Sequence, residues 1–176
     1  MLLRWHGWEK GNFLFFSLLP LPLVLLGGLI YLAHGDYERI RAERHRRAEL
    51  VCLAENVYYE ARGEPLSGQY GVAEVTMNRV ASPQFPDTVC EVVHERRWDP
   101  LRDRFVGAFS WTELQPLPAP VGPAWDRALR VAEEVYDNER PPALDGALYY
   151  HATRVEPTWA RTKERVARIG RHVFYR

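Results

Sequence analysis

The feature that most constrains this chain is an uncharged, apolar run near its N-terminus, FLFFSLLPLPLVLLGGLIYLA, at residues 13–33. The run has about the roughly 20 residues that a helix needs to cross a bilayer. It also lacks the polar face of a helix that packs on a soluble core. Tyr31 and Leu32 precede Ala33, so the small-x-small pattern of a signal-peptide cleavage site is absent. We therefore predict a retained transmembrane anchor behind a cytoplasmic segment, residues 1–12.

The charged residues on either side of this run do not set its orientation. Arg4 and Lys10 precede it, and an arginine-rich segment, residues 34–49, follows it. Because cytoplasmic flanks usually carry the excess of Lys and Arg, the count does not favour an external C-terminal part. Residues 34–49 are expected to form a solvated juxtamembrane stalk, either helical or flexible.

Residues 50–176 have the composition of one globular domain. Apolar residues recur at helical spacing from Leu50 to a stop at Gly63–Pro65, which predicts a first helix. A second helix is expected from Ser67, a plausible N-cap, to Val80.

Local signals mark the remaining elements. A cap at Asp87 or Thr88 predicts a short helix, and Pro123 suits the first turn of a longer one. Two segments near the C-terminus, ALYYHA and RVARIGRHVFYR, are rich in β-branched and aromatic residues, and the second breaks at Gly170 as a hairpin would. These signals predict an α+β domain with a small antiparallel sheet.

Two observations limit the interpretation of the domain. Residues 96–112 show no clear period, so no element is predicted there. The formal net charge is +0, and no zinc-finger, RRM or helix-turn-helix pattern is present, so nucleic acid is not expected as a partner.

Glu60 is the carboxyl group most suited to chemistry in the stretch ENVYYEARGEPLSGQ. Both Glu55 and Glu60 lie at edges of the apolar face of the first helix, so helical position alone does not separate them. Glu60 also stands in the last turn, where the carbonyl end of the helix disfavours an anion and burial adds to that effect. We expect its pKa to be raised, as a general acid requires. An ion pair with Arg62 would oppose this.

Glu64 has a different environment from Glu60. It precedes Pro65 and is therefore displaced from helical geometry, so the two carboxyl groups do not stack on one helix face. We expect Glu64 to pair with Arg62 or Arg79.

Three parts of the sequence resemble the SleB-like family of cell wall hydrolases. They are CLAENVYYEARGEPLSGQYGVAEVTMNRVASPQFPDTVCEVV, FSWT, and ALYYHA with ARIGRHVFYR. The resemblance covers about the last two thirds of the chain and implies a lysozyme-like, mainly helical domain that acts on peptidoglycan. The glutamate proposed as the acid in this family corresponds to Glu60, and no cofactor is implied.

The resemblance implies a lytic transglycosylase, which needs one carboxyl group as acid and then base. Muramidase-type hydrolysis is the alternative and would need a second carboxylate, such as Glu74 or Asp99. Neither is strongly nominated by its spacing, and Glu74 is expected at the surface or in an ion pair.

A saccharide groove requires aromatic faces and amide donors. The candidates are Gln69, Phe109, Ser110, Tyr149, Tyr150 and His151. Successive side chains on a strand face opposite ways, so only one of the two tyrosines should line the groove, and we favour Tyr150. The resemblance implies glutamine directly before FSWT in many relatives, whereas this chain has Ala108, which predicts a local difference in the groove.

Two further classes of function remain open. A zinc amidase or peptidase would have to use isolated residues, because no HExxH or tight ligand pair is present. Its potential ligands are His94, His151, His172, Cys52 and Cys90. An inactive glycan-binding module would keep the aromatic residues but give Glu60 no role.

Cys52 and Cys90 bear on localisation. In an envelope protein they suggest a disulfide, with free buried thiols as the alternative. A disulfide and a peptidoglycan substrate would both place residues 50–176 outside the cell membrane, with the N-terminus inside. The expected partners are peptidoglycan strands, the membrane and an unidentified regulatory envelope protein.

Overall fold

The computed structural model describes residues 20–100, 102–114, 116–144 and 146–176. The chain divides into two compact units between His45 and Arg46, and helix α2, Pro20–Ala61, continues across this division. The sequence predicted a helix from Leu50 and, before it, a stalk at residues 34–49 that was either helical or flexible. The structure shows the stalk as helix continuous with the first predicted helix. Helix α2 is longer because residues 36–61 contain no glycine or proline, and the Arg and Glu residues of the expected stalk are good helix formers.

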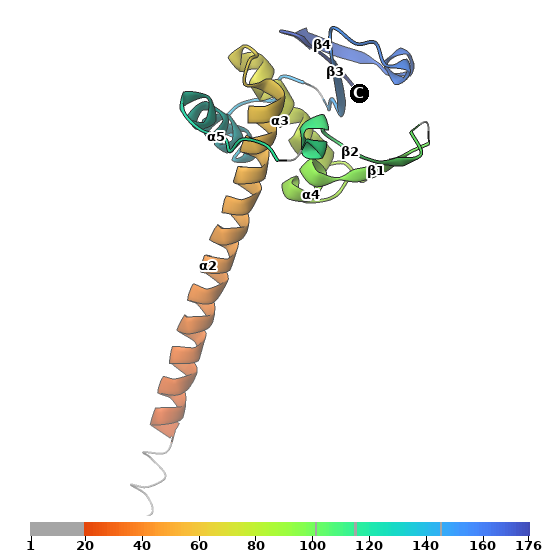
Figure 1. The fold of residues 1–176 in the computed structure, drawn as a ribbon. Coiled ribbons are helices and arrows are strands. Elements are labelled where there is room, and N and C mark those ends of the chain that lie inside the picture. The colour runs from red at the N-terminus through yellow and green to blue at the C-terminus, as the bar shows by residue number, and fades with distance from the viewer. Residues whose placement is uncertain (1–19, 101, 115, 145) are drawn as a thin grey trace, which may run out of the picture. The chain divides into compact units, whose positions relative to one another are not determined.

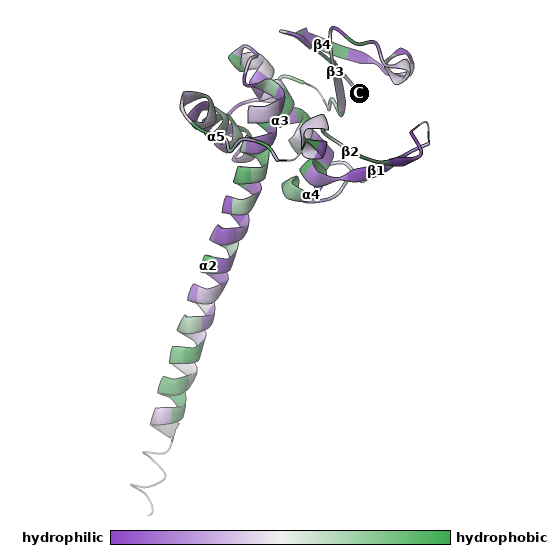
Figure 2. Cartoon of the chain, viewed as in Figure 1, coloured by the Kyte–Doolittle hydropathy of each residue, from purple (hydrophilic) through white to green (hydrophobic). Residues whose placement is uncertain are grey.

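The first unit contains the N-terminal part of α2. Figure 2 shows hydrophobic residues in its first turns and hydrophilic residues in the turns that follow. No helix in the described part of the chain is both long and apolar enough to cross a membrane. The expected anchor, residues 13–33, lies partly outside the described residues, and the expected segment 1–12 lies wholly outside them.

Three further helices belong to the second unit, Arg46–Arg176 (Figure 1). They are α3, Leu66–Val80; α4, Val89–His94; and α5, Pro123–Tyr136. Thr88 caps α4 by accepting the N–H of Glu91, and Pro123 opens α5, as predicted. The predicted cap at Ser67 is wrong, because α3 begins one residue earlier and Pro65 holds the N-cap position without a side-chain hydrogen bond.

The main core joins α2 to the other helices of the second unit. Leu53, Val57 and Val93 are fully or almost fully buried in it. Asn56 of α2 lies at 0% exposure, donates to Thr76 Oγ1 of α3 at 3.0 Å and accepts from Trp111 Nε1 at 3.0 Å. These bonds satisfy a buried amide and fix how the three elements pack.

A two-stranded hairpin occupies the region for which the sequence showed no period. Strands β1, Arg96–Asp99, and β2, Arg104–Gly107, pair antiparallel, and a 3₁₀ turn, Ser110–Glu113, follows. Most residues of both strands are exposed on either face. A strand with no buried face has no alternation of apolar and polar residues, which explains why the sequence did not reveal it.

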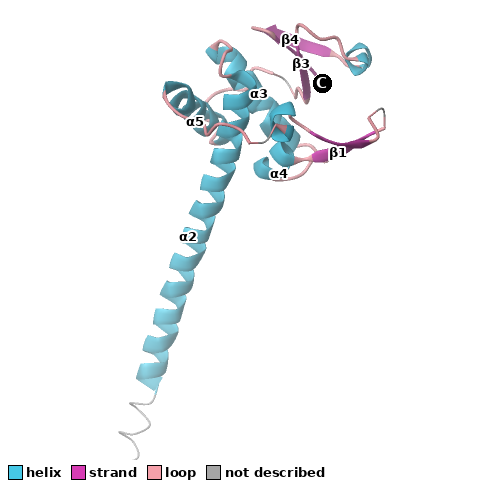
Figure 3. Cartoon of the chain, in the orientation of Figure 1, coloured by secondary structure: helices cyan, strands magenta, loops and turns pink. Residues whose placement is uncertain are grey.

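The C-terminal strands form the predicted small antiparallel sheet (Figure 3). Its strands are β3, Tyr149–Ala152; β4, Arg165–Ile169; and β5, His172–Tyr175, in the order β3-β5-β4. Gly170 lies in the β4–β5 turn with a φ of 56°, a conformation that favours glycine. A side chain at Gly71 would meet the Phe174 ring at 2.7 Å, so glycine there lets α3 approach the sheet closely.

A disulfide joins the first helix of the second unit to α4. Cys52 and Cys90 are bonded, with their Cα atoms 5.2 Å apart and a sequence separation of 38. Next to it, Glu49 Oε2 accepts the N–H of Val89 at 2.5 Å. The disulfide and the hydrogen bond to Glu49 together fix the N-terminus of α4 against α2.

Removing the disulfide should destabilise the second unit. A loop of this size predicts a loss of about 2–4 kcal/mol in the free energy of unfolding, because the unfolded chain gains freedom. Urea unfolding of the full chain with and without reductant measures the effect. In a Cys52→Ala/Cys90→Ala control the reductant should change nothing. Equal stability of the oxidised and reduced wild type would contradict the prediction.

Candidate active site

Glu60 and Tyr150 meet where the last turn of α2 approaches the C-terminal sheet. The Tyr150 hydroxyl donates to Glu60 Oε2 at 3.3 Å, across 90 residues of sequence. Both side chains are half-buried. The contact brings together the two residues that the sequence favoured most for acid chemistry and for the groove.

The environment of Glu60 favours its protonated form. Burial raises the pKa of this carboxyl group, and it outweighs the opposing effects of the Tyr150 hydrogen bond and the charges of Arg79 and Arg154. The direction agrees with the sequence prediction. Arg62, the expected competitor, lies over the Tyr58 ring at 5.0 Å. The site therefore holds a carboxyl group that keeps its proton to higher pH than an exposed glutamate does.

Arg79 is a buried cation that contacts the residues around the site. It is 8% exposed, and its Nε donates to the carbonyl oxygen of Leu148 at 2.8 Å, directly before β3. Its guanidinium lies over the rings of Phe85 and Phe109 at 5.2 and 5.0 Å. Arg79 thus fixes the start of β3 and places a buried positive charge near Glu60. From its position in the sequence, Arg79 was expected only as a partner for Glu64.

Glu64 has a structural role that the sequence did not show. Its carboxylate accepts the N–H of Arg171 at 2.8 Å and the Nε of the same residue at 2.6 Å. Burial raises the pKa of Glu64, but these bonds and the charges of His172 and Arg171 together outweigh burial and leave the pKa lowered. The expected pairing with Arg62 or Arg79 is wrong, since the actual partner lies 107 residues away in the β4–β5 turn.

The three predicted groove residues outside β3 differ in exposure and partners. Gln69 is 2% exposed, and its amide donates to the carbonyl oxygen of Glu64, so its side chain holds the turn between α2 and α3. Phe109 is 3% exposed and belongs to the main core. Ser110 is exposed at the start of the 3₁₀ turn. Of the three, only Ser110 offers an exposed side chain.

The three candidate residues on strand β3 lie on two different faces of the strand. Tyr150 faces Glu60, with its ring 5.1 Å from His172 and 5.7 Å from Phe174. Tyr149 and His151 both contact Trp159, at 5.8 and 5.7 Å between ring centroids. Alternation along the strand thus separates Tyr150 from its neighbours. Trp159 was not identified from the sequence, because it lies in a short 3₁₀ turn, Thr158–Thr162, which gives no periodic signal.

The carboxylates considered as second acids are engaged elsewhere. Glu74 is 5% exposed, and its Oε2 accepts the N–H groups of Ala143 and Leu144, both at 2.9 Å. Its expected surface position is therefore wrong. Asp99 lies in the β1–β2 hairpin and pairs with Arg102 at 3.6 Å. Glu55 resembles Glu60 in that burial raises its pKa, with the charge of His94 opposing.

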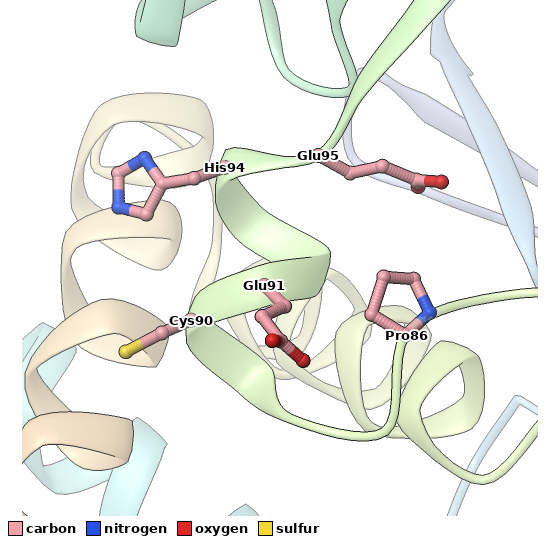
Figure 4. Close-up of a pocket in the computed structure, with 5 residues that line it drawn as sticks. All are labelled: Pro86, Cys90, Glu91, His94 and Glu95. Carbon is pink, nitrogen blue, oxygen red and sulfur yellow. The ribbon is translucent and has the colours of Figure 1, made fainter.

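The potential metal ligands do not form a metal site in the described residues. No group of three or more His, Cys, Asp or Glu side chains there is arranged to hold an ion, and Cys52 and Cys90 are bonded to each other. A pocket beside α4 gathers several such residues (Figure 4). It is lined by Pro86, Cys90, Glu91, His94 and Glu95. His151 and His172 contact aromatic residues of the sheet instead, Tyr175 and Tyr150 respectively.

The site is a half-buried carboxyl group of raised pKa on a mainly helical domain with small antiparallel sheets. Residues 63–175 match the family model described as Cell Wall Hydrolase, and the chain belongs to that family. The match begins just after Glu60, so the assignment of Glu60 depends on the site geometry and the resemblance of the surrounding segment.

Curated relatives of this chain include two spore cortex-lytic enzymes. The one from Bacillus subtilis (strain 168) is 33% identical over 126 residues, covering 72% of this chain and 37% of that protein. The one from Oceanobacillus iheyensis is 33% identical over 129 residues, covering 72% and 41%. The chain thus spans less than half the length of these relatives.

Two solved structures share the fold. The catalytic domain of the germination-specific lytic transglycosylase SleB from Bacillus anthracis has a TM-score of 0.54 and 28% identity, over 73% of this chain and 93% of that one. The catalytic domain of the Bacillus cereus SleB protein has a TM-score of 0.53 and 30% identity, over 74% and 91%. These matches cover most of both solved domains.

Replacing Tyr150 should change the acidity of Glu60. In Tyr150→Phe the carboxylate loses a hydrogen bond that favours its charged form, so the pKa of Glu60 should rise further. NMR titration of the ¹³C-labelled Glu carboxyl groups measures it. Tyr149→Phe is the matched control and should leave the pKa of Glu60 unchanged, because that ring faces away. An unchanged or lowered pKa in Tyr150→Phe would refute the contact.

Proposed function

We propose that this chain cleaves peptidoglycan glycan strands between N-acetylmuramic acid and N-acetylglucosamine as a lytic transglycosylase. The observation that carries the proposal is the half-buried Glu60, whose pKa burial raises and whose Oε2 accepts the Tyr150 hydroxyl. Membership of the Cell Wall Hydrolase family and similarity to a solved lytic transglycosylase domain support it.

Glu60 serves as both acid and base in this mechanism. Protonated, it donates to the glycosidic oxygen, and the bond from that oxygen to C1 of the muramic residue breaks. The resulting carboxylate then takes the proton of the muramic C6 hydroxyl while O6 attacks C1 and closes a 1,6-anhydro ring. Glu60 regains its proton, and no water is consumed.

The surroundings of Glu60 suit both halves of this cycle. Burial favours the protonated form that the first step needs. The Tyr150 hydroxyl and the charges of Arg79 and Arg154 stabilise the carboxylate that exists between the steps. The N-acetyl group of the substrate can stabilise the positive charge that develops at C1, so a second enzyme carboxylate is unnecessary.

Muramidase-type hydrolysis is less well supported. Both of its candidate second carboxylates have other partners, since Glu74 binds two backbone N–H groups and Asp99 pairs with Arg102.

Among the groove candidates, we propose that Tyr150 and the exposed Ser110 contact the sugar next to the cleaved bond.

Replacing Glu60 by Gln should abolish cleavage. Loss of a general acid and base predicts a fall in rate of about 100- to 10,000-fold. Mass spectrometry of products from purified peptidoglycan measures it, using the full chain in detergent. The wild type should release 1,6-anhydromuropeptides. The matched control is Glu55→Gln, which removes another half-buried carboxyl group of raised pKa from the same helix and should leave the rate unchanged.

Any other result of this experiment supports one of the alternative functions. Reducing-end products from the wild type would replace transglycosylation by hydrolysis. Undiminished cleavage by Glu60→Gln would remove Glu60 from the mechanism and reopen the zinc amidase or peptidase class. Binding of peptidoglycan without any cleavage would favour the inactive glycan-binding module.

We also propose that residues 13–33 anchor the chain in the cell membrane, with the N-terminus inside and residues 50–176 outside. The support is the absence of charge in that run, the Cys52–Cys90 disulfide, which is typical of oxidising compartments, and the proposed substrate. The arginine-rich segment that follows the run opposes this orientation under the positive-inside rule.

Protease treatment of intact spheroplasts tests the orientation. A tag at the C-terminus of the full chain should be digested from outside, while a tag at the N-terminus should survive until the cells are lysed. The chain should remain in the membrane fraction after alkaline carbonate extraction. Protection of the C-terminal tag, or release by carbonate, would refute the proposed topology or the anchor respectively.

A further inference from the structure

An aromatic groove lies between the β1–β2 hairpin and the C-terminal sheet, which neighbour each other in Figure 1. It has a volume of about 490 Å³, within the range of small-ligand sites in proteins. Trp98 lines it from the hairpin, and Tyr149, Trp159 and Lys163 line it from the sheet and the segment between β3 and β4. None of these four residues takes part in the acid–base mechanism at Glu60.

The aromatic rings of the groove are held in place but remain partly open to solvent. Trp98 is 53% exposed, and its ring packs edge-on against Phe105 with centroids 5.3 Å apart. Tyr149 lies between Trp159, at 5.8 Å, and Phe85, at 6.2 Å. Exposed large apolar side chains gathered at one hollow are typical of a binding surface. Their flat faces suit the apolar face of a pyranose ring.

Lys163 supplies a positive charge without a partner carboxylate. Its Nζ lies 3.6 Å from the centroid of the Tyr149 ring, and the side chain is half-buried. The described residues include no carboxylate in an ion pair with it. The groove's own carboxylate, Asp99, pairs with Arg102 at 3.6 Å, and Arg97 pairs with Glu95 at 2.7 Å. A fixed, partly desolvated ammonium group beside an aromatic hollow favours a ligand that carries both a ring face and an anion.

The groove and Glu60 lie on opposite faces of strand β3 and are linked by consecutive residues of that strand. Tyr149 lines the groove, and the next residue, Tyr150, donates to Glu60 from the opposite face of the strand. Because β3 pairs only with β5, its other edge carries no further strand of this sheet. Phe85 contacts Tyr149, and Arg79 lies over the Phe85 ring, which extends the contacts to the surroundings of Glu60.

We propose that this groove is a further subsite for a peptidoglycan sugar of the bound strand and that Lys163 binds a free carboxylate of the attached peptide stem. The proposal rests on the proposed function and makes it more specific, because it selects strands that carry stems with free carboxylates. Trp98 and Trp159 contact the sugar ring in any strand, whereas Lys163 contributes only when the stem is present.

Binding to two ligands that differ only in the stem separates these roles. The full chain with Glu60→Gln in detergent prevents cleavage during the measurement. The probes are soluble uncross-linked peptidoglycan strands and the same strands after an amidase has removed their stems. Calorimetry gives the two affinities for each further variant. Circular dichroism and thermal unfolding establish that each variant is folded.

Lys163→Gln should weaken binding of stem-bearing strands about tenfold, as expected for the loss of one charge-assisted hydrogen bond, and leave stem-free strands unaffected. Lys163→Arg keeps the positive charge and should therefore retain most of the affinity for stem-bearing strands that Lys163→Gln loses. Trp98→Ala should weaken binding of both probes. Arg168→Gln is the matched control. It removes an exposed positive charge from β4, close in sequence to Lys163 but outside the groove lining, and should change neither affinity.

The outcomes separate this inference from the function on which it rests. Equal affinity of Lys163→Gln and its parent for stem-bearing strands would overturn the carboxylate contact. Unchanged binding of both probes by Trp98→Ala would overturn the groove. If the variants behave as expected but the chain with Glu60 intact produces no cleaved glycan, the subsite stands and the transglycosylase proposal fails.

Discussion

The hydrogen bonds from Arg171 to Glu64 are the interaction on which the candidate site depends most. They join the turn after α2 to the turn between β4 and β5, through both the backbone N–H and the side chain of Arg171. A side chain at Gly170 would lie 2.3 Å from Glu64 Oε2, so the contact also requires glycine there. Because β5 pairs with β3, this link positions Tyr150 to reach Glu60.

The two glutamates of the Glu-Ala-Arg-Gly-Glu motif show how environment separates chemistry from structure. Burial acts on both, but Glu64 accepts bonds from Arg171 that favour its charged form, and its pKa is lowered. Glu60 has only a Tyr hydroxyl and more distant charges to oppose burial, and its pKa is raised. A carboxylate with strong partners stabilises a fold, whereas one without them can exchange a proton with a substrate.

Sequence-based prediction was accurate for most features that a single residue decides locally, although it misplaced the N-cap of α3 at Ser67. The cap at Thr88, the start of α5 at Pro123 and the hairpin turn at Gly170 all follow from such local rules. It failed where distant contacts decide, because spacing carries no information about a partner 107 residues away. Arg171 was therefore missed as the partner of Glu64, and Glu74 was not recognised as a buried acceptor of backbone N–H groups.

Strand β3 links the two proposed roles of the domain through its alternation. Tyr150 points to the acid, while Tyr149 on the other face belongs to the aromatic groove with Lys163 over its ring. The two residues are consecutive, so a shift of register by one would exchange their faces and separate Tyr150 from Glu60. Pairing with the fully buried β5 opposes such a shift, because Val173, Phe174 and Tyr175 would lose their packing. The buried strand thus fixes the recognition groove and the reactive carboxyl group in one register.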